Sequence, residues 1–336
     1  MKNVLVTGGT GLLGNNIIRQ LMDSGFDVAA AVRKSSDRQP FSDLDVEIRE
    51  VDFEDQASIE QSLEGIDTVI HSAGFIWFGW KKLEQSRKVN VGITSRIAGV
   101  CLSRNMRFIH VSSLDALPVG RGSEDIVDEE ALNNESKWQP KVPCNYVISK
   151  READQAIKKL WQEGLSGCIV HPGLMLGPYD WKPSSGELIQ AVAKLGFWFS
   201  CPTGGISVTD VRDVANATIR AAQDHSTSGR HFILGGHNIP YWQLCKRIAE
   251  KCGVRQPRGR TGWIAYGAAG MIGSLSALFG KETIVNTAAI RMAWLFNYYS
   301  SQRAIDELGY QIRDLDETLD EAIEWLASQQ MIKISK

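Results

Sequence analysis

Tyr146 and Lys150 stand four positions apart in the stretch Tyr146-Val147-Ile148-Ser149-Lys150. In a helix, this spacing places both side chains on one face. An ammonium group close to a phenol favours the phenolate and lowers the pKa of the phenol toward the working range. The pair therefore predicts a tyrosine that acts as a general acid or base. Because the same spacing occurs by chance on many surface helices, its interpretation depends on the rest of the chain.

A glycine-rich turn near the N-terminus suggests which reaction such a tyrosine would serve. The apolar run 3–7 leads into Gly8-Gly9-Thr10-Gly11-Leu12-Leu13-Gly14, and apolar residues then recur at helical spacing through 17–22. This pattern predicts a strand, a tight turn and a helix. Gly9-x-Gly11-x-x-Gly14 fits the dinucleotide fingerprint, in which glycines let a pyrophosphate approach the helix N-terminus. An ordinary glycine turn is the alternative reading.

The next predicted strand, 27–32, ends at Arg33 and Lys34. An acidic residue at this place binds the ribose 2′-hydroxyl of NAD, whereas an arginine accommodates the 2′-phosphate of NADP. The two cations therefore favour NADP(H), with NAD(H) as the alternative. The other reading is that both are solvated loop residues. A third strand, 46–51, ends at Asp52 and Phe53, which are placed to flank an adenine.

The chain resembles the extended short-chain dehydrogenase/reductase superfamily over nearly its whole length. Thr7, Gly8, Gly11 and Gly14 match that family's first motif, and the later segments match in order. These segments are His71-Ser72-Ala73-Gly74, Val89-Asn90-Val91-Gly92-Ile93-Thr94, the strand 108–113 ending in Ser113, Tyr146 with Lys150, His171-Pro172-Gly173, and Arg303 to Tyr310. The resemblance implies a Rossmann-type α/β fold with a smaller C-terminal substrate lobe.

The resemblance also implies a role for each matched residue. Hydride would pass between a nicotinamide and a substrate carbonyl or alcohol, with Tyr146 as the acid or base and Ser113 hydrogen-bonded to the same oxygen. Lys150 would lower the pKa of Tyr146 and bind the nicotinamide ribose, and Asn90 would hold a relay water. The expected cofactor-binding residues are Thr7, Gly8, Thr10, Gly11, Leu12, Leu13, Gly14, Arg33, Lys34, Asp52, Phe53, Ser72, Ala73, Gly74, Ser112, Tyr146, Lys150, Pro172 and Gly173.

Within the superfamily the chain looks most like the dihydroflavonol reductase-like, hopanoid-associated sugar epimerase-like and 3β-hydroxysteroid dehydrogenase-like branch. Arg33, the long spacing from Ser113 to Tyr146 and the segment 177–183 point there. We expect an oxidoreductase for a small, hydrophobic or cyclic substrate. A nucleotide-sugar epimerase or dehydratase with bound NAD is the first alternative. A non-catalytic dinucleotide sensor is the second, and the intact Ser113, Tyr146 and Lys150 argue against it.

Strand and helix patterns alternate through residue 173, which predicts a doubly wound parallel sheet. We expect a nucleotide domain over 1–173, with returning segments near 208–222 and 231–235, and a substrate lobe over most of 174–336. The sheet is expected to regain a strand near Val208, followed by a helix capped by Asp213. The polar connection 115–145 is interpreted as a surface loop that borders the substrate, and Trp77, Phe78 and Trp80 as pocket or packing aromatics.

Composition and the remaining stretches of the sequence bear on the partners and the location of the protein. The chain has 336 residues, is 43% hydrophobic and has a net charge of −2, which argues against a nucleic-acid-binding surface. The six cysteines lack the spacing of a metal site and are expected to be buried free thiols. The start of the chain does not resemble a signal leader, so we expect a cytoplasmic protein. The uncharged stretch 261–280 is interpreted as a cover for the substrate pocket, with peripheral membrane contact as an alternative. The superfamily resemblance suggests a homodimer.

Overall fold

The structure is a computed structural model that describes residues 1–133, 138–139, 141–260, 267 and 286–334. Its main sheet has seven strands in the order β3-β2-β1-β4-β5-β6-β10, and every neighbouring pair is parallel. The strands are β1 (Asn3–Thr7), β2 (Asp27–Val32), β3 (Glu47–Glu50), β4 (Thr68–His71), β5 (Arg107–Val111), β6 (Ile169–Pro172) and β10 (His231–Leu234). This is the doubly wound arrangement that the sequence predicted, with the reversal of strand order beside β1.

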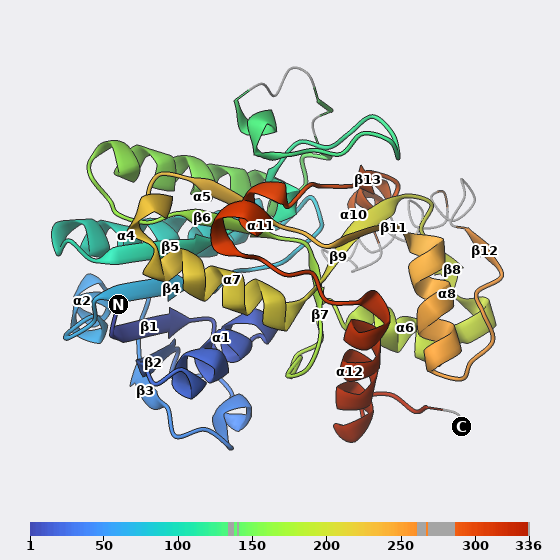
Figure 1. Cartoon of the computed structure of the whole chain (residues 1–336), viewed down its shortest axis with the longest axis horizontal. Coiled ribbons are helices and arrows are strands. Elements are labelled where there is room, and N and C mark those ends of the chain that lie inside the picture. Colours follow the sequence, from blue (N-terminus) through green and yellow to red (C-terminus); the bar gives the residue numbers. More distant parts are fainter. Residues whose placement is uncertain (134–137, 140, 261–266, 268–285, 335–336) are drawn as a thin grey trace.

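Helices cover both faces of the main sheet (Figure 1). The α-helices of the described residues are α1 (Leu12–Asp23), α2 (Gln56–Ser62), α3 (Leu83–Arg87), α4 (Thr94–Ser103), α5 (Asn145–Gln162), α6 (Glu187–Leu195), α7 (Val211–Gln223), α8 (Tyr241–Lys251), α10 (Thr287–Ala293), α11 (Gln302–Leu308) and α12 (Leu315–Ser328). Side chains of β1 alternate between two cores: Val4 and Val6 join the cluster under α1 and α7, whereas Leu5 joins the cluster under α2, α4 and α5. This alternation is the two-residue period of a strand.

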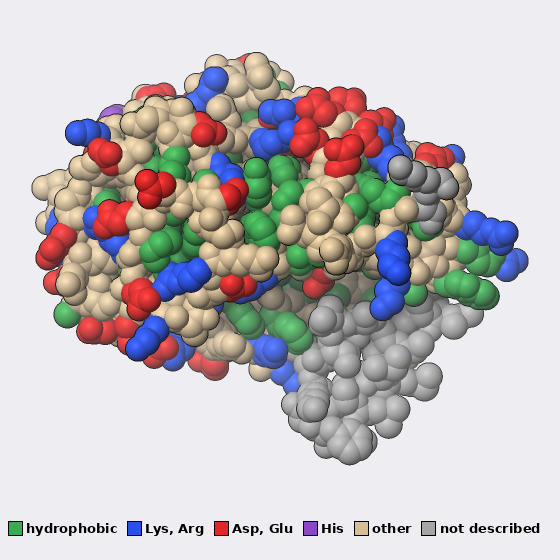
Figure 2. Space-filling model, turned by 90° about the horizontal axis from the view of Figure 1, so that it is seen from below, with side chains coloured by type: hydrophobic (Ala, Val, Ile, Leu, Met, Phe, Trp, Pro, Cys, Tyr) green, Lys and Arg blue, Asp and Glu red, His purple; other side chains and the backbone are tan. Residues whose placement is uncertain are grey.

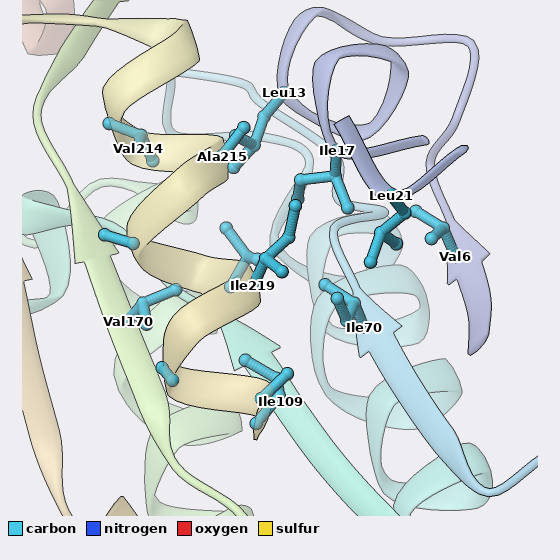
Figure 3. Close-up of a cluster of buried hydrophobic side chains, with 14 of the residues drawn as sticks. Val6, Leu13, Ile17, Leu21, Ile70, Ile109, Val170, Val214, Ala215 and Ile219 are labelled. Carbon is cyan, nitrogen blue, oxygen red and sulfur yellow. The ribbon is translucent and has the colours of Figure 1, made fainter. Parts of the chain in front are cut away.

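The cluster under α1 and α7 fixes the position of the N-terminal turn. Figure 3 shows Ile17 and Leu21 of α1 facing Ile219 of α7, with Ile70 and Ile109 of the sheet beneath them. Burying each of these side chains contributes about 1.5–3 kcal/mol relative to leaving it exposed. The start of α1 is therefore held firmly at the carboxyl end of β1.

A second, smaller sheet carries the C-terminal part of the chain. It contains β7 (Leu174–Leu176), β9 (Gly205–Asp210), β11 (His237–Pro240) and β13 (Phe296–Asn297), while β8 (Ser200–Cys201) pairs with β12 (Gly259–Arg260). The strand expected near Val208 is β9, which pairs with β7, β11 and β13 and not with the main sheet. That expectation was wrong. The helix that follows β9, α7, does pack against α1, which covers one face of the main sheet.

Two further local expectations need correction. The N-cap of α7 is Asp210, whose side chain accepts from Arg212 N, whereas Asp213 lies in the first turn and accepts from Arg313 N and Nε. The connection 115–145 does not lie wholly at the surface. Within it, Glu129 is buried and accepts from Ile233 N at 2.8 Å, which anchors the connection to the edge strand β10.

Several compositional expectations can be compared with the structure. All six cysteines are buried, and none of them forms a disulfide bond. On the face in Figure 2, Lys and Arg side chains are interspersed with Asp and Glu. None of the helices in the described ranges is long and apolar enough to cross a membrane. The stretch 261–280 lies outside the described residues except for Gly267, so its predicted role stays a prediction.

Candidate active site

The glycine turn closes tightly at the carboxyl end of β1. Gly11 N donates to Gly8 O at 2.9 Å, and Gly8 has a φ of +74°, which glycine adopts without strain. A Cβ on Gly8 would lie 2.7 Å from Ala73 N, and a Cβ on Gly14 would lie 2.3 Å from Gly8 O. Gly11 is the N-cap of α1 and provides no side-chain cap. The first N–H groups of α1 are therefore available to an anion at this turn.

A buried network joins this turn to the end of β4. The Thr7 hydroxyl is hydrogen-bonded to His71 Nδ1 at 2.8 Å and accepts from Ala73 N at 3.2 Å. On the other side of the ring, His71 Nε2 is hydrogen-bonded to Thr94 Oγ1 at 2.9 Å. Burial lowers the pKa of His71 well below its usual value, so the ring is neutral. Thr7 thus positions the Ser72–Gly74 segment from beneath.

A first cavity of about 510 Å³ runs from the glycine turn to Tyr146 and Lys150. Thirteen of the expected cofactor-binding residues line it: Gly8, Thr10, Gly11, Leu12, Leu13, Arg33, Phe53, Ser72, Ala73, Gly74, Ser112, Tyr146 and Lys150. Arg33 is exposed at the end of β2 and forms no ion pair with the described residues. A cavity that connects a glycine turn at a helix N-terminus to a Tyr–Lys pair has the extent that a dinucleotide requires.

The other expected cofactor-binding residues do not line the first cavity. Thr7 and Gly14 lie behind the turn, and Pro172 and Gly173 line a second cavity. Lys34 is exposed and outside the lining. The Asp52 carboxylate accepts from Glu54 N at 2.9 Å, so it stabilises its own turn.

Tyr146 and Lys150 lie on one face of α5, as their spacing predicted. Both are buried, and both line the first cavity. Lys150 Nζ donates to Val111 O at 2.9 Å, which ties α5 to the end of β5. The Phe78 ring contacts the Tyr146 ring edge to face, with centroids 5.1 Å apart. The phenol is therefore fixed between the end of β5 and an aromatic wall.

The protonation of this pair differs from the sequence-based expectation. Burial raises the pKa of Tyr146, the Asp115 carboxylate raises it further, and an interaction with the Ser113 hydroxyl opposes the rise. Burial lowers the pKa of Lys150 to about 8, and Asp154 opposes that fall. Lys150 was expected to lower the pKa of Tyr146. In the structure, burial outweighs the opposing interactions and the neutral phenol is favoured.

Asn90 lies in a turn of π-helix, Lys88–Ile93, between α3 and α4. Its Oδ1 accepts from Phe75 N at 2.7 Å, and its Nδ2 donates to Phe75 O and to Ser149 Oγ. Its backbone carbonyl accepts from Thr94 Oγ1 at 2.7 Å. Asn90 lines neither cavity, and it holds the segment after Gly74 against α5. The predicted relay water at Asn90 stays a prediction.

Asp154 is a buried carboxyl that the sequence analysis did not single out. Ser112 Oγ donates to Asp154 Oδ2 at 2.9 Å, and His110 Nε2 lies 3.4 Å from Asp154 Oδ1. His171 Nδ1 lies 4.0 Å from Asp154 Oδ2. Burial raises the pKa of Asp154, while His171, Ser112 and Lys150 oppose the rise. Asp154 stands four positions after Lys150, so the same helical spacing that identified the pair could have identified it.

A second cavity of about 300 Å³ adjoins the first. Both cavities are lined by Ile76, Ser112, Tyr146, Met175 and Ser184. The remaining lining residues of the second are Phe78, Ser113, Leu114, Asp115, Pro172, Gly173, Leu174, Ser185, Ile206, Ser207, Tyr241, Ala289, Met292, Ala293 and Asn297. Most of these side chains are apolar, and none of the described lining residues is Lys or Arg. The structure thus brings Ser113 and Tyr146 together at the point where the two cavities meet.

The three aromatic residues after β4 have different environments. Phe78 lines the second cavity, as the pocket interpretation expected. Lys82 Nζ lies 3.5 Å from the centroid of the Trp77 ring, and Trp80 Nε1 donates to Thr287 Oγ1 at 3.1 Å. Trp77 and Trp80 therefore make local or interlobe contacts, and neither lines the cavities.

Other lining residues were not among the predicted site residues. In the first cavity, Gln85, Val89 and Ile93 recur at helical spacing before α4, a signal that could have been found. In the second cavity, Tyr241 and Asn297 come from α8 and β13. No local pattern connects these two residues to Tyr146, because tertiary folding alone brings them there.

Comparisons with known proteins give the family of the chain. A family model described as "NAD dependent epimerase/dehydratase family" matches residues 4–235. The chain is 28% identical to a "Putative dihydroflavonol 4-reductase" of Synechocystis sp. over 98% of this chain and 95% of that one. It is 25% identical to a "3 beta-hydroxysteroid dehydrogenase/Delta 5-->4-isomerase" of Mycobacterium tuberculosis, covering 92% and 85%. A solved structure of a nucleoside-diphosphate-sugar epimerase from Pseudomonas aeruginosa superimposes with a TM-score of 0.77, at 25% identity and 99% coverage of both chains.

Proposed function

Because the chain belongs to the NAD dependent epimerase/dehydratase family, an extended short-chain dehydrogenase/reductase type of NAD(P)-dependent enzyme, we propose that it is an NADP(H)-dependent oxidoreductase. Its substrate is a small, hydrophobic or cyclic carbonyl compound or the matching alcohol. The observation that carries this proposal is the junction of the two cavities at Tyr146, which interacts with Ser113 in the lining of the second cavity. One cavity fits the dinucleotide, and the other fits an apolar substrate.

The bound cofactor supplies the hydride, and the protein positions and polarises the substrate. In reduction, Tyr146 donates its proton to the carbonyl oxygen as negative charge develops there. Its raised pKa keeps the phenol protonated before this step. Ser113 donates a hydrogen bond to the same oxygen and stabilises the developing charge. The apolar lining of the second cavity excludes water and strengthens both interactions.

Lys150 supports this proton transfer from beside the phenol. With a pKa near 8 it is largely charged at neutral pH, and Asp154 stabilises that charge. The charged ammonium provides the proton that restores the Tyr146 phenol after each turnover, and it binds the nicotinamide ribose hydroxyls. Ser112 is hydrogen-bonded to Asp154 and so keeps this carboxyl next to the reacting pair.

Arg33 supports the choice of NADP(H). It lines the first cavity at the end of β2, where the acidic residue of NAD-selective sites would stand, and Ser36 lines the cavity beside it. A guanidinium that forms no ion pair with the described residues is available to a 2′-phosphate. Lys34, which lies outside the lining, is not needed for this contact.

The second cavity favours a hydrophobic substrate over a nucleotide sugar. A nucleoside diphosphate carries negative charge that proteins usually bind with Arg, Lys or helix N-termini. Among the described lining residues of the second cavity, the one charged side chain is Asp115, and none is a Lys or Arg that could bind a phosphate. A nucleotide-sugar epimerase remains the second candidate, since the Pseudomonas aeruginosa structure described above bears that name.

The replacement of Tyr146 by phenylalanine tests this function. We expect the Y146F protein to bind NADPH with a dissociation constant within about twofold of the parent, since the ring still fills its place beside Phe78. Reduction of any ketone that the parent reduces should fall by about 100- to 10,000-fold, the usual contribution of a general acid. NADPH binding is followed by its fluorescence and turnover by absorbance at the nicotinamide band. Parent-like turnover by Y146F would overturn the proposal.

A further inference from the structure

Besides its serines and Tyr146, the second cavity is lined by three further polar side chains: Asp115, Tyr241 and Asn297. They come from three distant parts of the chain, the turn after β5, the start of α8 and the strand β13. Neither the acid/base chemistry of Tyr146 nor the binding of a dinucleotide requires them. Asn297 is buried, whereas Asp115 and Tyr241 are half-buried. A buried polar group is rarely left without a partner, so Asn297 in particular needs an explanation.

Asp115 is a carboxylate with one oxygen in use. Lys141 Nζ donates to Asp115 Oδ1 at 2.9 Å and to Leu114 O at 2.8 Å, and the Lys141 side chain is fully buried. No described residue donates to Asp115 Oδ2. A carboxylate oxygen is a strong acceptor that requires a donor. Lys141 balances the charge of Asp115. Asp115 Oδ2 is therefore a hydrogen-bond acceptor in surroundings that carry little net charge.

Asn297 is an almost fully buried amide, with an exposed fraction of 7%. Its Oδ1 is completely buried and has no partner within the described residues. No described residue is hydrogen-bonded to its Nδ2 either. The backbone of Asn297 is fixed, since β13 pairs with β9 at Ile206, another lining residue. An unpaired buried amide destabilises the folded protein, and a ligand that accepts from Asn297 Nδ2 would reduce that cost.

Tyr241 completes the set. It is the first residue of α8, and Tyr241 N donates to Gly204 O at 3.1 Å. Its hydroxyl has no hydrogen-bond partner in the part of the chain that the structure describes. Tyr241 lines the same cavity as Asp115 and Asn297. A phenol can both donate and accept, so Tyr241 can orient a ligand group held between Asp115 and Asn297.

We propose that Asp115, Tyr241 and Asn297 bind a hydroxyl group of the substrate, so that the substrate is an uncharged, largely hydrophobic carbonyl compound bearing a second oxygen. This rests on the proposed function, because it names the substrate class of the same site. The hydroxyl donates to Asp115 Oδ2 and accepts from Asn297 Nδ2 or from the Tyr241 hydroxyl. Because Asp115 and Lys141 together carry no net charge, neither an anionic nor a cationic group gains an unpaired counter-ion here.

The test uses ketones that differ by one hydroxyl. The first pair is 4-phenylbutan-2-one and 4-(4-hydroxyphenyl)butan-2-one. The second, longer pair is 5α-androstan-3-one and 17β-hydroxy-5α-androstan-3-one. Calorimetry measures the dissociation constant of each ketone with the protein alone and with NADP⁺, a form of the cofactor that cannot reduce it. The proteins compared are the parent, Asn297→Leu, Tyr241→Phe, and Tyr298→Phe as a control that removes a phenol hydroxyl outside the cavity lining.

In at least one pair the hydroxylated ketone should bind about tenfold more tightly to the parent, the value of a net hydrogen bond to a charged group. Asn297→Leu and Tyr241→Phe should each reduce this preference without weakening the binding of the ketone that lacks the hydroxyl. Tyr298→Phe should leave it unchanged. Equal affinities within both pairs, or no binding of any ketone, would overturn the inference. A preserved binding preference without any reduction by NADPH would instead count against the proposed function.

Discussion

Replacement of Gly14 by alanine tests whether the glycine turn is the cofactor's phosphate site. The new Cβ would lie 2.3 Å from Gly8 O, 2.6 Å from Gly8 C and 2.9 Å from Gly9 N. All three neighbours are backbone atoms, so no side chain can rotate away. Since ordinary carbon–oxygen contacts exceed about 3.3 Å, the turn must move away from α1 by about 1 Å.

This displacement is expected to affect the stability of the protein and its affinity for NADPH to different extents. Overpacking costs about 1–3 kcal/mol, less than the stability of about 5–15 kcal/mol of a typical protein, so the G14A protein should fold. Hydrogen bonds are useful only over a donor–acceptor range of about 2.7–3.2 Å, so a shift of about 1 Å removes contacts between the turn and the pyrophosphate. Loss of two charge-assisted bonds, each worth about 1.5–3 kcal/mol, predicts a dissociation constant for NADPH at least about 100-fold higher.

The assay is a fluorescence titration with NADPH, combined with urea unfolding of the same samples. Gly99→Ala, in the helix α4, is the matched control, because the added Cβ would meet no atom within 4 Å. We expect G99A to bind NADPH as the parent does and to be no less stable. If G14A binds NADPH within twofold of the parent, the reasoning that places the pyrophosphate at this turn is refuted.

Three further predictions concern the cofactor phosphate, the oxygen-binding serine and the buried charges. Arg33→Ala should raise the dissociation constant of NADPH about tenfold and that of NADH less than twofold, with Lys34→Ala as the control; equal effects on both cofactors would contradict the 2′-phosphate contact. Ser113→Ala should lower kcat/KM for reduction by about 100-fold at unchanged NADPH affinity, and an unchanged kcat/KM would exclude its role at the oxyanion. The rate of reduction should fall as pH rises through about 8, where Lys150 loses its proton, and Asp154→Asn should move that midpoint to lower pH. A rate that stays constant from pH 6 to 10 would contradict the role of the ammonium.

Much of the main sheet could be predicted because its signals are local. Strands buried on both faces are short apolar runs, and the β1–α1 connection carries its glycines within seven residues. The prediction that β9 joins the main sheet failed because a strand pattern does not specify its partners. Asp210 and Asp213 both suit a helix start, and only the backbone geometry shows which one is the cap.

Some residues of the candidate site could likewise be predicted from local patterns, whereas others depend on the tertiary structure. Tyr146 and Lys150 share a helix, so their spacing was informative, and the structure places both beside the first cavity. The raised pKa of Tyr146 could not be predicted, since it depends on burial and on Asp115, which belongs to a different segment. Asn297 is separated from Tyr146 by more than a hundred positions, and its unpaired amide becomes evident only in the folded chain.

The most direct test of the account is the transfer of deuterium from NADPH labelled at C4 of the nicotinamide. Both C4 stereoisomers are supplied, together with a mixture of small carbonyl compounds, and products are analysed by mass spectrometry. The account predicts that the parent protein yields an alcohol carrying one deuterium, from one stereoisomer of the labelled cofactor, and that Tyr146→Phe yields almost none while binding NADPH normally. Equal labelling by Tyr146→Phe, or the absence of any labelled alcohol with the parent, would contradict the central claim.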